Sequence, residues 1–118
     1  MDRSWKLYGT AVLLLVFFDL PWLLLNAETA QRIVFRIQGS DLKLKMAPAL
    51  IVYLALAYLV TKTESVTEAF KVGMAVYAVY DFTNLAMFKN YPLSFALMDT
   101  VWGGVLMALT RAALDKIF

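Results

Sequence analysis

The sequence predicts an all-α integral membrane protein, a four-helix bundle with both termini on the same side of the bilayer. Apolar residues make up 62% of the 118 positions and charged residues 17%, against about 45–50% and about 25% in soluble domains. Apolar segments of near-spanning length recur four times along the chain. Three of these segments contain an aspartate, a residue that membrane helices rarely carry without a reason.

Composition excludes several classes of protein. A disordered chain would be less apolar and more charged, and a disulfide scaffold needs the cysteine that is absent here. The absence of histidine as well removes imidazole and thiolate chemistry and leaves carboxylates as the only candidate general bases near neutral pH. No enzymatic activity is expected, because no nucleophile or metal motif accompanies them, and an intramembrane enzyme that uses paired carboxylates is the remaining alternative. A net charge of +2 is too small to indicate nucleic-acid binding. The chain is short enough that residues 1–118 are expected to form a single transmembrane domain.

The first two predicted helices cover about residues 7–26 and 46–61. The first is read as a retained span, because its apolar run is too long for a signal peptide and contains Asp19 and Pro21. The second is short for a span, but Lys45 and Lys62 at its ends can extend to the headgroups.

The last two predicted helices cover about residues 66–88 and 93–114. Ser65 and Glu68 have the spacing of a capping box at the start of the third helix. Residues 89–92, which end in a proline, predict a tight turn. The third and fourth helices are therefore expected to form an antiparallel hairpin.

The connection between the first two helices, residues 27–45, is longer and carries its own pattern. Ala30, Ile33, Val34 and Ile37 share one helical face, which predicts a short helix lying in the membrane interface. The alternative is a plain solvated loop.

Charge leaves the orientation nearly undetermined. Six of the 11 Lys and Arg residues fall on the side of the termini and five on the other side. The positive-inside rule needs a larger bias than this. Arg3 and Lys6 favour cytoplasmic termini.

Asp19, Asp81 and Asp99 are predicted to lie at one depth. Asp19 and Asp81 each precede the end of their helix by about seven residues, and Asp99 follows the start of its helix by six. At 1.5 Å per residue each lies roughly 10 Å from the same face. Because an aspartate in the bilayer costs roughly 2.5–3.5 kcal/mol on insertion scales, all three are expected to face protein or water.

Other polar side chains share the faces of these aspartates. Tyr77 and Asn84 lie four residues before and three after Asp81, and Thr83 lies beside this stripe. Helices one, three and four are therefore expected to form the polar centre. Helix two, with only Tyr53 and Tyr58 as internal polar groups, is expected to be peripheral.

An Asp-x-x-Trp pattern occurs twice, as Asp19 with Trp22 and as Asp99 with Trp102. The two helices that carry it are predicted to run in opposite directions, which is compatible with an inverted repeat.

Pro21 removes a backbone hydrogen bond to the carbonyl of Phe17, one turn earlier. A free carbonyl near carboxylates would suit a hard cation. A bound cation is therefore compatible with the sequence, although no cofactor is indicated and the metal stays unspecified. The alternative is a purely structural cluster, in which the aspartates bond to Trp, Tyr, Asn84 or nearby lysines.

Small residues mark one face of the fourth helix at a spacing of four. Such ridges allow helix backbones to approach closely, and no reactive group lies on this one. The residues expected to serve helix packing are Thr100, Gly103, Gly104 and Ala108.

The chain resembles a family of small predicted membrane proteins catalogued as Domain of Unknown Function 2177. The resemblance rests on Tyr-Asp-Phe-Thr-Asn at 80–84, on the Lys-x-x-Pro-Leu turn at 89–93 and on Asp-x-x-Trp-Gly at 99–103. Asn-Tyr at 90–91 stands where the family commonly has Gly-Trp. The resemblance implies a four-helix membrane fold but no activity. It also implies importance for Asp19, Asp81, Asn84, Asp99 and Trp102.

The expected function is a multi-pass transporter or channel in which the intramembrane aspartates bind a cation or exchange protons. Three close carboxylates do not all ionise without a cation, so a shared proton or a metal is expected. One protomer is thin for a pathway, which favours a homo-oligomer in the lipid bilayer. The alternative is an accessory or structural subunit of a larger membrane complex.

Overall fold

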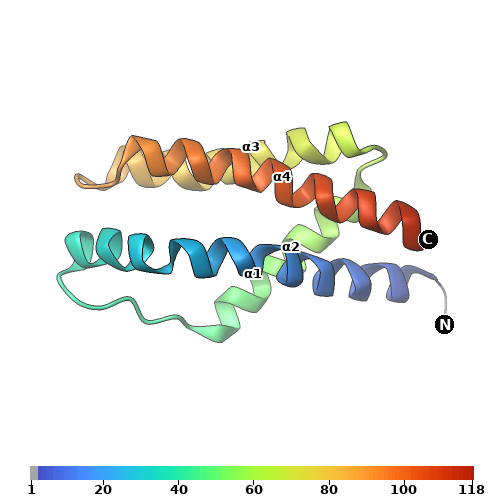
Figure 1. Ribbon diagram of the computed structural model, residues 1–118, viewed down its shortest axis with the longest axis horizontal. Helices are drawn as coiled ribbons and strands as arrows, with labels where there is room; N and C mark the ends of the chain where they lie inside the picture. The colour runs from blue at the N-terminus through green and yellow to red at the C-terminus, as the bar shows by residue number, and fades with distance from the viewer. Residues whose placement is uncertain (1–2) are drawn as a thin grey trace.

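The computed structural model describes residues 3–118, and Met1 and Asp2 lie outside this part of the chain. The described residues form four helices and no strand, so the predicted all-α, four-helix architecture is confirmed. α1 begins and α4 ends at the same end of the molecule (Figure 1). The helices are α1 Arg3–Gln38, α2 Met46–Lys62, α3 Val66–Met87 and α4 Leu93–Ile117.

The predicted boundaries of α2, α3 and α4 agree with the structure to within three residues. The capping box is present, because the Ser65 side chain accepts a hydrogen bond of 3.0 Å from the backbone N–H of Glu68. The prediction for the first helix was wrong at its carboxyl end. α1 does not stop near residue 26 but continues without interruption to Gln38.

α1 continues because nothing between Asn26 and Gln38 breaks a helix and its apolar stripe has a surface to cover. Ile33 is buried against Tyr91 and Ala96 beside the α3–α4 turn. The stripe predicted for a separate interfacial helix is therefore the last part of α1. Gly39, with a φ of +72°, ends the helix, in the left-handed conformation that favours glycine.

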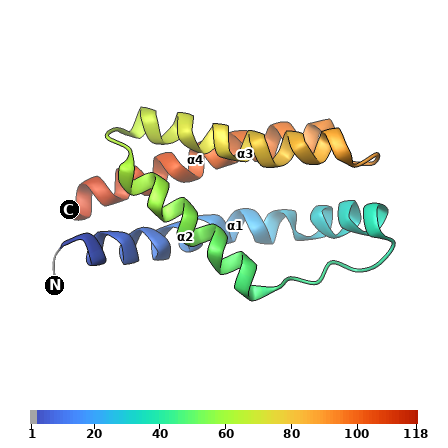
Figure 2. The same cartoon turned by 180° about the vertical axis from the view of Figure 1, so that it is seen from behind.

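The connection that follows α1 folds back along it. Gln31 donates a hydrogen bond of 2.9 Å to the Asp41 carboxylate and accepts one of 2.8 Å from the backbone N–H of Leu42. The loop consequently covers only residues 39–45, and α2 then crosses α1 obliquely (Figure 2).

α3 and α4 form the most closely packed pair, lying side by side along their length (Figures 1 and 2). Glycine allows this closeness. A Cβ on Gly73 would lie 2.2 Å from the backbone oxygen of Gly103, and one on Gly104 would lie 2.6 Å from the Met74 side chain. α1 packs against α2 and α4, but its backbone makes no contact with that of α3 within residues 3–118.

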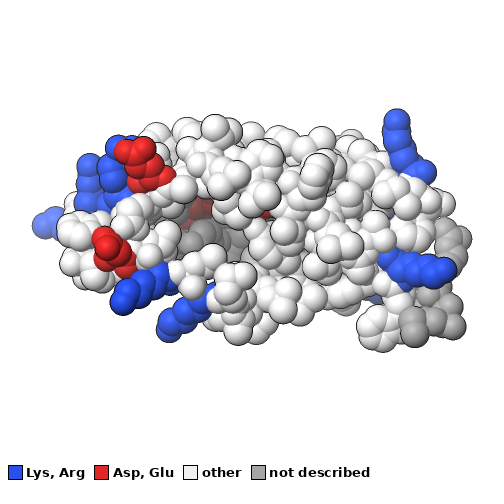
Figure 3. Space-filling model, turned by 60° about the horizontal axis from the view of Figure 1, so that its bottom comes forward, with Lys and Arg blue, Asp and Glu red and all other residues white. Residues whose placement is uncertain are grey.

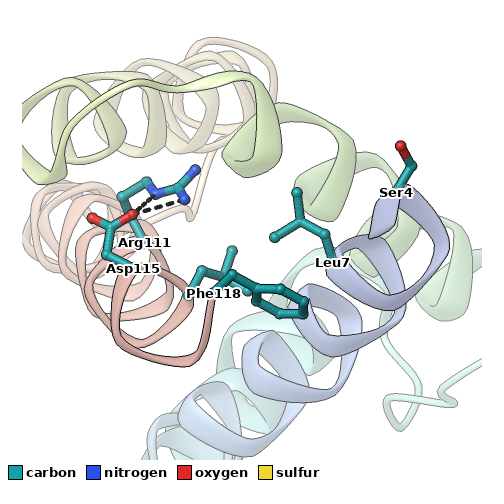
Figure 4. Close-up of a pocket in the computed structure, with 6 residues that line it drawn as sticks. Ser4, Leu7, Arg111, Asp115 and Phe118 are labelled. Carbon is teal, nitrogen blue, oxygen red and sulfur yellow. Dashed lines mark hydrogen bonds and ion pairs between the residues drawn. The ribbon is translucent and has the colours of Figure 1, made fainter. Parts of the chain in front are cut away.

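Arg111 joins α4 to the carboxyl end of α2. Its guanidinium donates to the carbonyls of Val60 and Thr63, at 3.2 and 3.1 Å, and pairs with Asp115 at 2.8 Å. Figure 4 shows this pair in a pocket between the start of α1 and the end of α4, across from Leu7. Arg111 therefore supplies further donors to backbone oxygens at the end of α2, where the Val60 carbonyl also accepts from the backbone N–H and the hydroxyl of Thr63.

Replacing Arg111 by methionine is expected to lower the free energy of unfolding by about 2 kcal/mol, since charge-assisted hydrogen bonds contribute roughly 1.5–3 kcal/mol. Lys116→Met is the matched control, because Lys116 is an exposed cation one turn further along α4. Denaturation midpoints in one detergent give the comparison. Equal midpoints for the two variants would show that Arg111 does not hold the end of α2.

Charged side chains are concentrated at the two ends of the molecule, and the surface between them is mainly uncharged on the face drawn in Figure 3. Within the described chain, two helices are long and apolar enough to cross a membrane, residues 4–38 of α1 and the whole of α4. α2 is apolar but shorter. Large apolar side chains such as Leu25 and Leu13 are 80% and 72% exposed.

Candidate functional site

Asp19 lies on the inner face of α1, where both of its carboxylate oxygens accept hydrogen bonds. Tyr53 of α2 donates to Oδ2 at 2.5 Å, and the indole N–H of Trp102 in α4 donates to Oδ1 at 2.7 Å. The carboxylate is buried, and burial of such a group is tolerated when donors replace water. Asp19 therefore ties three helices together.

Asp99 of α4 has the reciprocal partner. The indole N–H of Trp22, in α1, donates to its Oδ1 at 3.2 Å. The rings of Trp22 and Trp102 stack with centroids 5.1 Å apart and planes 8° from parallel. The tryptophan of each Asp-x-x-Trp element thus donates its indole N–H to the aspartate of the other element, across two antiparallel helices. The α1–α4 contact therefore has a local two-fold character.

Asp81 of α3 is fully buried, and only one of its oxygens has a donor. The Tyr91 hydroxyl donates to Oδ1 at 2.7 Å, whereas Oδ2 has no hydrogen-bond partner among the described residues. The carboxyl group of Asp99 lies within hydrogen-bonding reach of that of Asp81. Two ionised carboxylates only accept hydrogen bonds, so one proton held between them would supply the missing donor.

The structure thus places the three predicted aspartates in one buried region, with exposed fractions of 5% for Asp19, 0% for Asp81 and 8% for Asp99. Figure 3 shows acidic atoms inside a hollow, between the two charged ends. The aspartates do not have equal surroundings. Asp19 has a donor on each oxygen, whereas Asp81 and Asp99 lie against each other.

The predicted supporting residues lie at different distances from this region. The ring of Tyr77 packs onto Gly103, where it would block a Cβ. Asn84 is half-buried and lies within reach of the Tyr91 hydroxyl. Thr83 is exposed on the outside of α3, so the structure does not bring it to the aspartates.

Pro21 and Phe17 both have exposed side chains. These two side chains lie on the outer face of α1, whereas Asp19 is buried. Residues four apart, such as Phe17 and Pro21, share one face of a helix, and Asp19, midway between them, lies on another face. That the Phe17 carbonyl joins the carboxylates in binding a cation stays a prediction.

The small residues of α4 lie where close packing needs them. Gly103 and Gly104 are buried against α3, and Ala108 is half-buried. Thr100 is also buried, but its hydroxyl has no hydrogen-bond partner among the described residues.

Tyr53 and Tyr91 are the two contributors that sequence reasoning missed. α2 was expected to be peripheral, but its Tyr53 donates to Asp19, so that expectation was wrong. Tyr91 was read only as part of a turn, although its hydroxyl reaches Asp81. A tyrosine about ten residues from a buried aspartate and next to a turn proline is a weak signal, because helix spacing rules do not extend across a turn.

Among residues 3–118, no group of three or more His, Cys, Asp or Glu side chains is placed to hold a metal ion. The arrangement suits proton exchange, which needs only two carboxyl groups in contact and one proton.

A family model described as "Predicted membrane protein (DUF2177)" matches residues 4–114. The chain belongs to this family. None of the curated proteins and none of the solved structures matches the chain. The DUF2177 match includes all three aspartates and both tryptophans of the Asp-x-x-Trp elements.

Proposed function

We propose that this DUF2177 protein is a multi-pass integral membrane protein that carries protons, as a transporter or channel, through its buried aspartates. The long axis of 48 Å is close to the roughly 40–45 Å of a bilayer with its headgroups. The charged ends and the mainly uncharged surface between them support an orientation with this axis across the membrane (Figure 3). The start of α1 and the end of α4 lie at one end of the molecule (Figure 1), which supports both termini on one side. α2 and α3 would complete the crossing.

One observation carries the proton-linked role: the unpartnered Oδ2 of the fully buried Asp81, next to the Asp99 carboxyl. No lysine or arginine donates a hydrogen bond to either carboxyl group within the described chain. A purely structural cluster would be expected to satisfy every buried oxygen, as Asp19 does. An exchangeable proton accounts for the difference.

A homo-oligomer is the proposed working form. One bundle of four helices leaves little space for a pathway, and apolar side chains along α1 remain exposed. The second candidate is an accessory subunit of a larger membrane complex, which the same exposed surface favours. Co-purification in mild detergent separates the two, because a subunit is recovered with other proteins in fixed ratio and an oligomer is recovered alone.

Proton flux into proteoliposomes tests the proposed function. With a membrane potential imposed, we expect wild-type protein to acidify the lumen faster than protein-free liposomes, and Asp99→Asn to abolish at least nine-tenths of that excess rate. Glu28→Gln is the matched control, because Glu28 is an exposed carboxylate near the end of α1. It should match the wild type. Wild-type flux equal to that of empty liposomes, or flux unaffected by Asp99→Asn, would contradict the proposal.

A further inference from the structure

We propose that protons reach the Asp81–Asp99 pair from the α3–α4 turn through the hydroxyl group of Tyr91. This inference rests on the proposed proton-linked function and assigns its point of entry. A hydronium ion that reaches the turn gives a proton to the phenol oxygen and becomes water, while the phenol gives its own proton to the Asp81 carboxylate. One O–H bond forms on Tyr91 as another breaks, so the tyrosine ends neutral.

The position of Tyr91 supports its role as the entry point for protons. It lies in the connection between α3 and α4, at the end of the molecule opposite the termini (Figure 1). Its hydroxyl is 2.7 Å from Asp81 Oδ1, and the Asp81 carboxyl lies against that of Asp99. Tyr91 is 8% exposed, so its hydrogen bond links the turn at this end of the molecule to the buried pair.

The chemistry of the hydrogen-bond donors at the three aspartates explains why the proton path is assigned to Tyr91. A phenol both donates and accepts, so it passes a proton on, whereas an indole N–H only donates. Asp99 is held by Trp22, and Asp19 is held by Trp102 as well as Tyr53. Tyr91 is thus the phenol that hydrogen-bonds to the Asp81–Asp99 pair, whereas the phenol that bonds to Asp19 is that of Tyr53.

The surroundings of Tyr91 suit a relay that stays neutral. Its ring packs against Ile33, Ala96 and, edge to face at 6.0 Å, Phe95. The polar groups near its hydroxyl are Asp81, Asn84 and Tyr80. Burial, and then the hydrogen bond to Asp81, raise the pKa of Tyr91 above its ordinary value, so the phenol keeps its proton at neutral pH and is available to donate.

The test follows the exchange of the carboxyl proton in the reconstituted protein. The carboxylic C=O band in the infrared spectrum shifts when the proton is replaced by deuterium, and rapid mixing with D₂O gives the exchange rate. We expect Tyr91→Phe to slow this exchange at least tenfold. Tyr58→Phe is the matched control, because it removes the same hydroxyl from a tyrosine that is 56% exposed and lies outside the candidate site, and it should leave the rate unchanged.

A second variant separates relay from simple positioning. Tyr91→Trp keeps a donor near Asp81 but removes the acceptor function, so exchange should stay slow. A denaturation midpoint close to that of the wild type confirms that each variant is folded. Wild-type exchange rates in Tyr91→Phe, or recovery of the wild-type rate in Tyr91→Trp, would overturn the role of Tyr91. A wild-type protein without an exchangeable carboxyl band would instead contradict the proposed function itself.

Discussion

Valine at position 73 is expected to separate α3 from α4 and to lower the free energy of unfolding by about 3 kcal/mol or more. Even a Cβ on Gly73 would lie 2.2 Å from the backbone oxygen of Gly103, and a backbone atom does not rotate away as a side chain does. Overpacking typically costs about 1–3 kcal/mol, and a backbone clash belongs at the upper end. Denaturation in one detergent, followed by helical circular dichroism, measures the effect.

Gly9→Ala is the control for this experiment. Gly9 lies inside α1, and a Cβ there meets no atom within 4 Å. Alanine is favoured over glycine inside a helix by roughly 0.5–1 kcal/mol, so this variant should be slightly more stable than the wild type. Equal stability of Gly73→Val and Gly9→Ala would show that α3 and α4 do not approach through Gly73.

Leucine in place of Asp19 has the second largest expected effect. The change removes the acceptor for the Tyr53 hydroxyl and the Trp102 indole together. Each buried donor left without a partner costs about 1–3 kcal/mol, so a loss of about 2–6 kcal/mol is expected. The contact between α1, α2 and α4 should weaken with it.

Tyr58→Phe serves as the reference for Asp19→Leu. Tyr58 lies in the same helix as Tyr53 but is 56% exposed, so losing its hydroxyl should change the denaturation midpoint very little. If Asp19→Leu and Tyr58→Phe are tolerated equally, Asp19 does not hold the helices together.

Most of the fold could be predicted from the sequence because its signals are local. The apolar segments, the Ser65 cap and the turn that ends at Pro92 are each recognised from residues that are neighbours in the chain. They predict the bounds of three helices to within three residues. The end of α1 could not be predicted this way. Its extension to Gln38 depends on Ile33 packing against Tyr91 and Ala96, which are about sixty residues away in the chain.

The site shows the same division between local and distant information. The helical rise predicted that the three aspartates lie at one level, because this calculation needs only residue numbers and helix boundaries. It did not reveal which indole bonds to which carboxylate, since Trp22 serves Asp99 and Trp102 serves Asp19 rather than their own neighbours. Tyr53 was missed for a related reason: the direction in which α2 crosses α1 decides what its hydroxyl meets.

The difference between Asp19 and the other two aspartates is the point that most needs measurement. Asp19 has a donor on each oxygen, whereas Asp81 and Asp99 are expected to share one proton at neutral pH. Deprotonation of a carboxyl group replaces its C=O band by carboxylate bands, so infrared spectroscopy distinguishes the two states directly.

Infrared titration of the reconstituted wild type, with Asp19→Asn and Asp99→Asn beside it, is the most direct test. We predict a protonated carboxyl band at neutral pH that disappears at high pH, persists in Asp19→Asn and is lost in Asp99→Asn. A band lost only in Asp19→Asn would assign the proton to Asp19 and contradict a proton shared by Asp81 and Asp99. No protonated band at any pH near neutrality, and no change on adding divalent cations, would contradict the proton site and leave a structural cluster of aspartates.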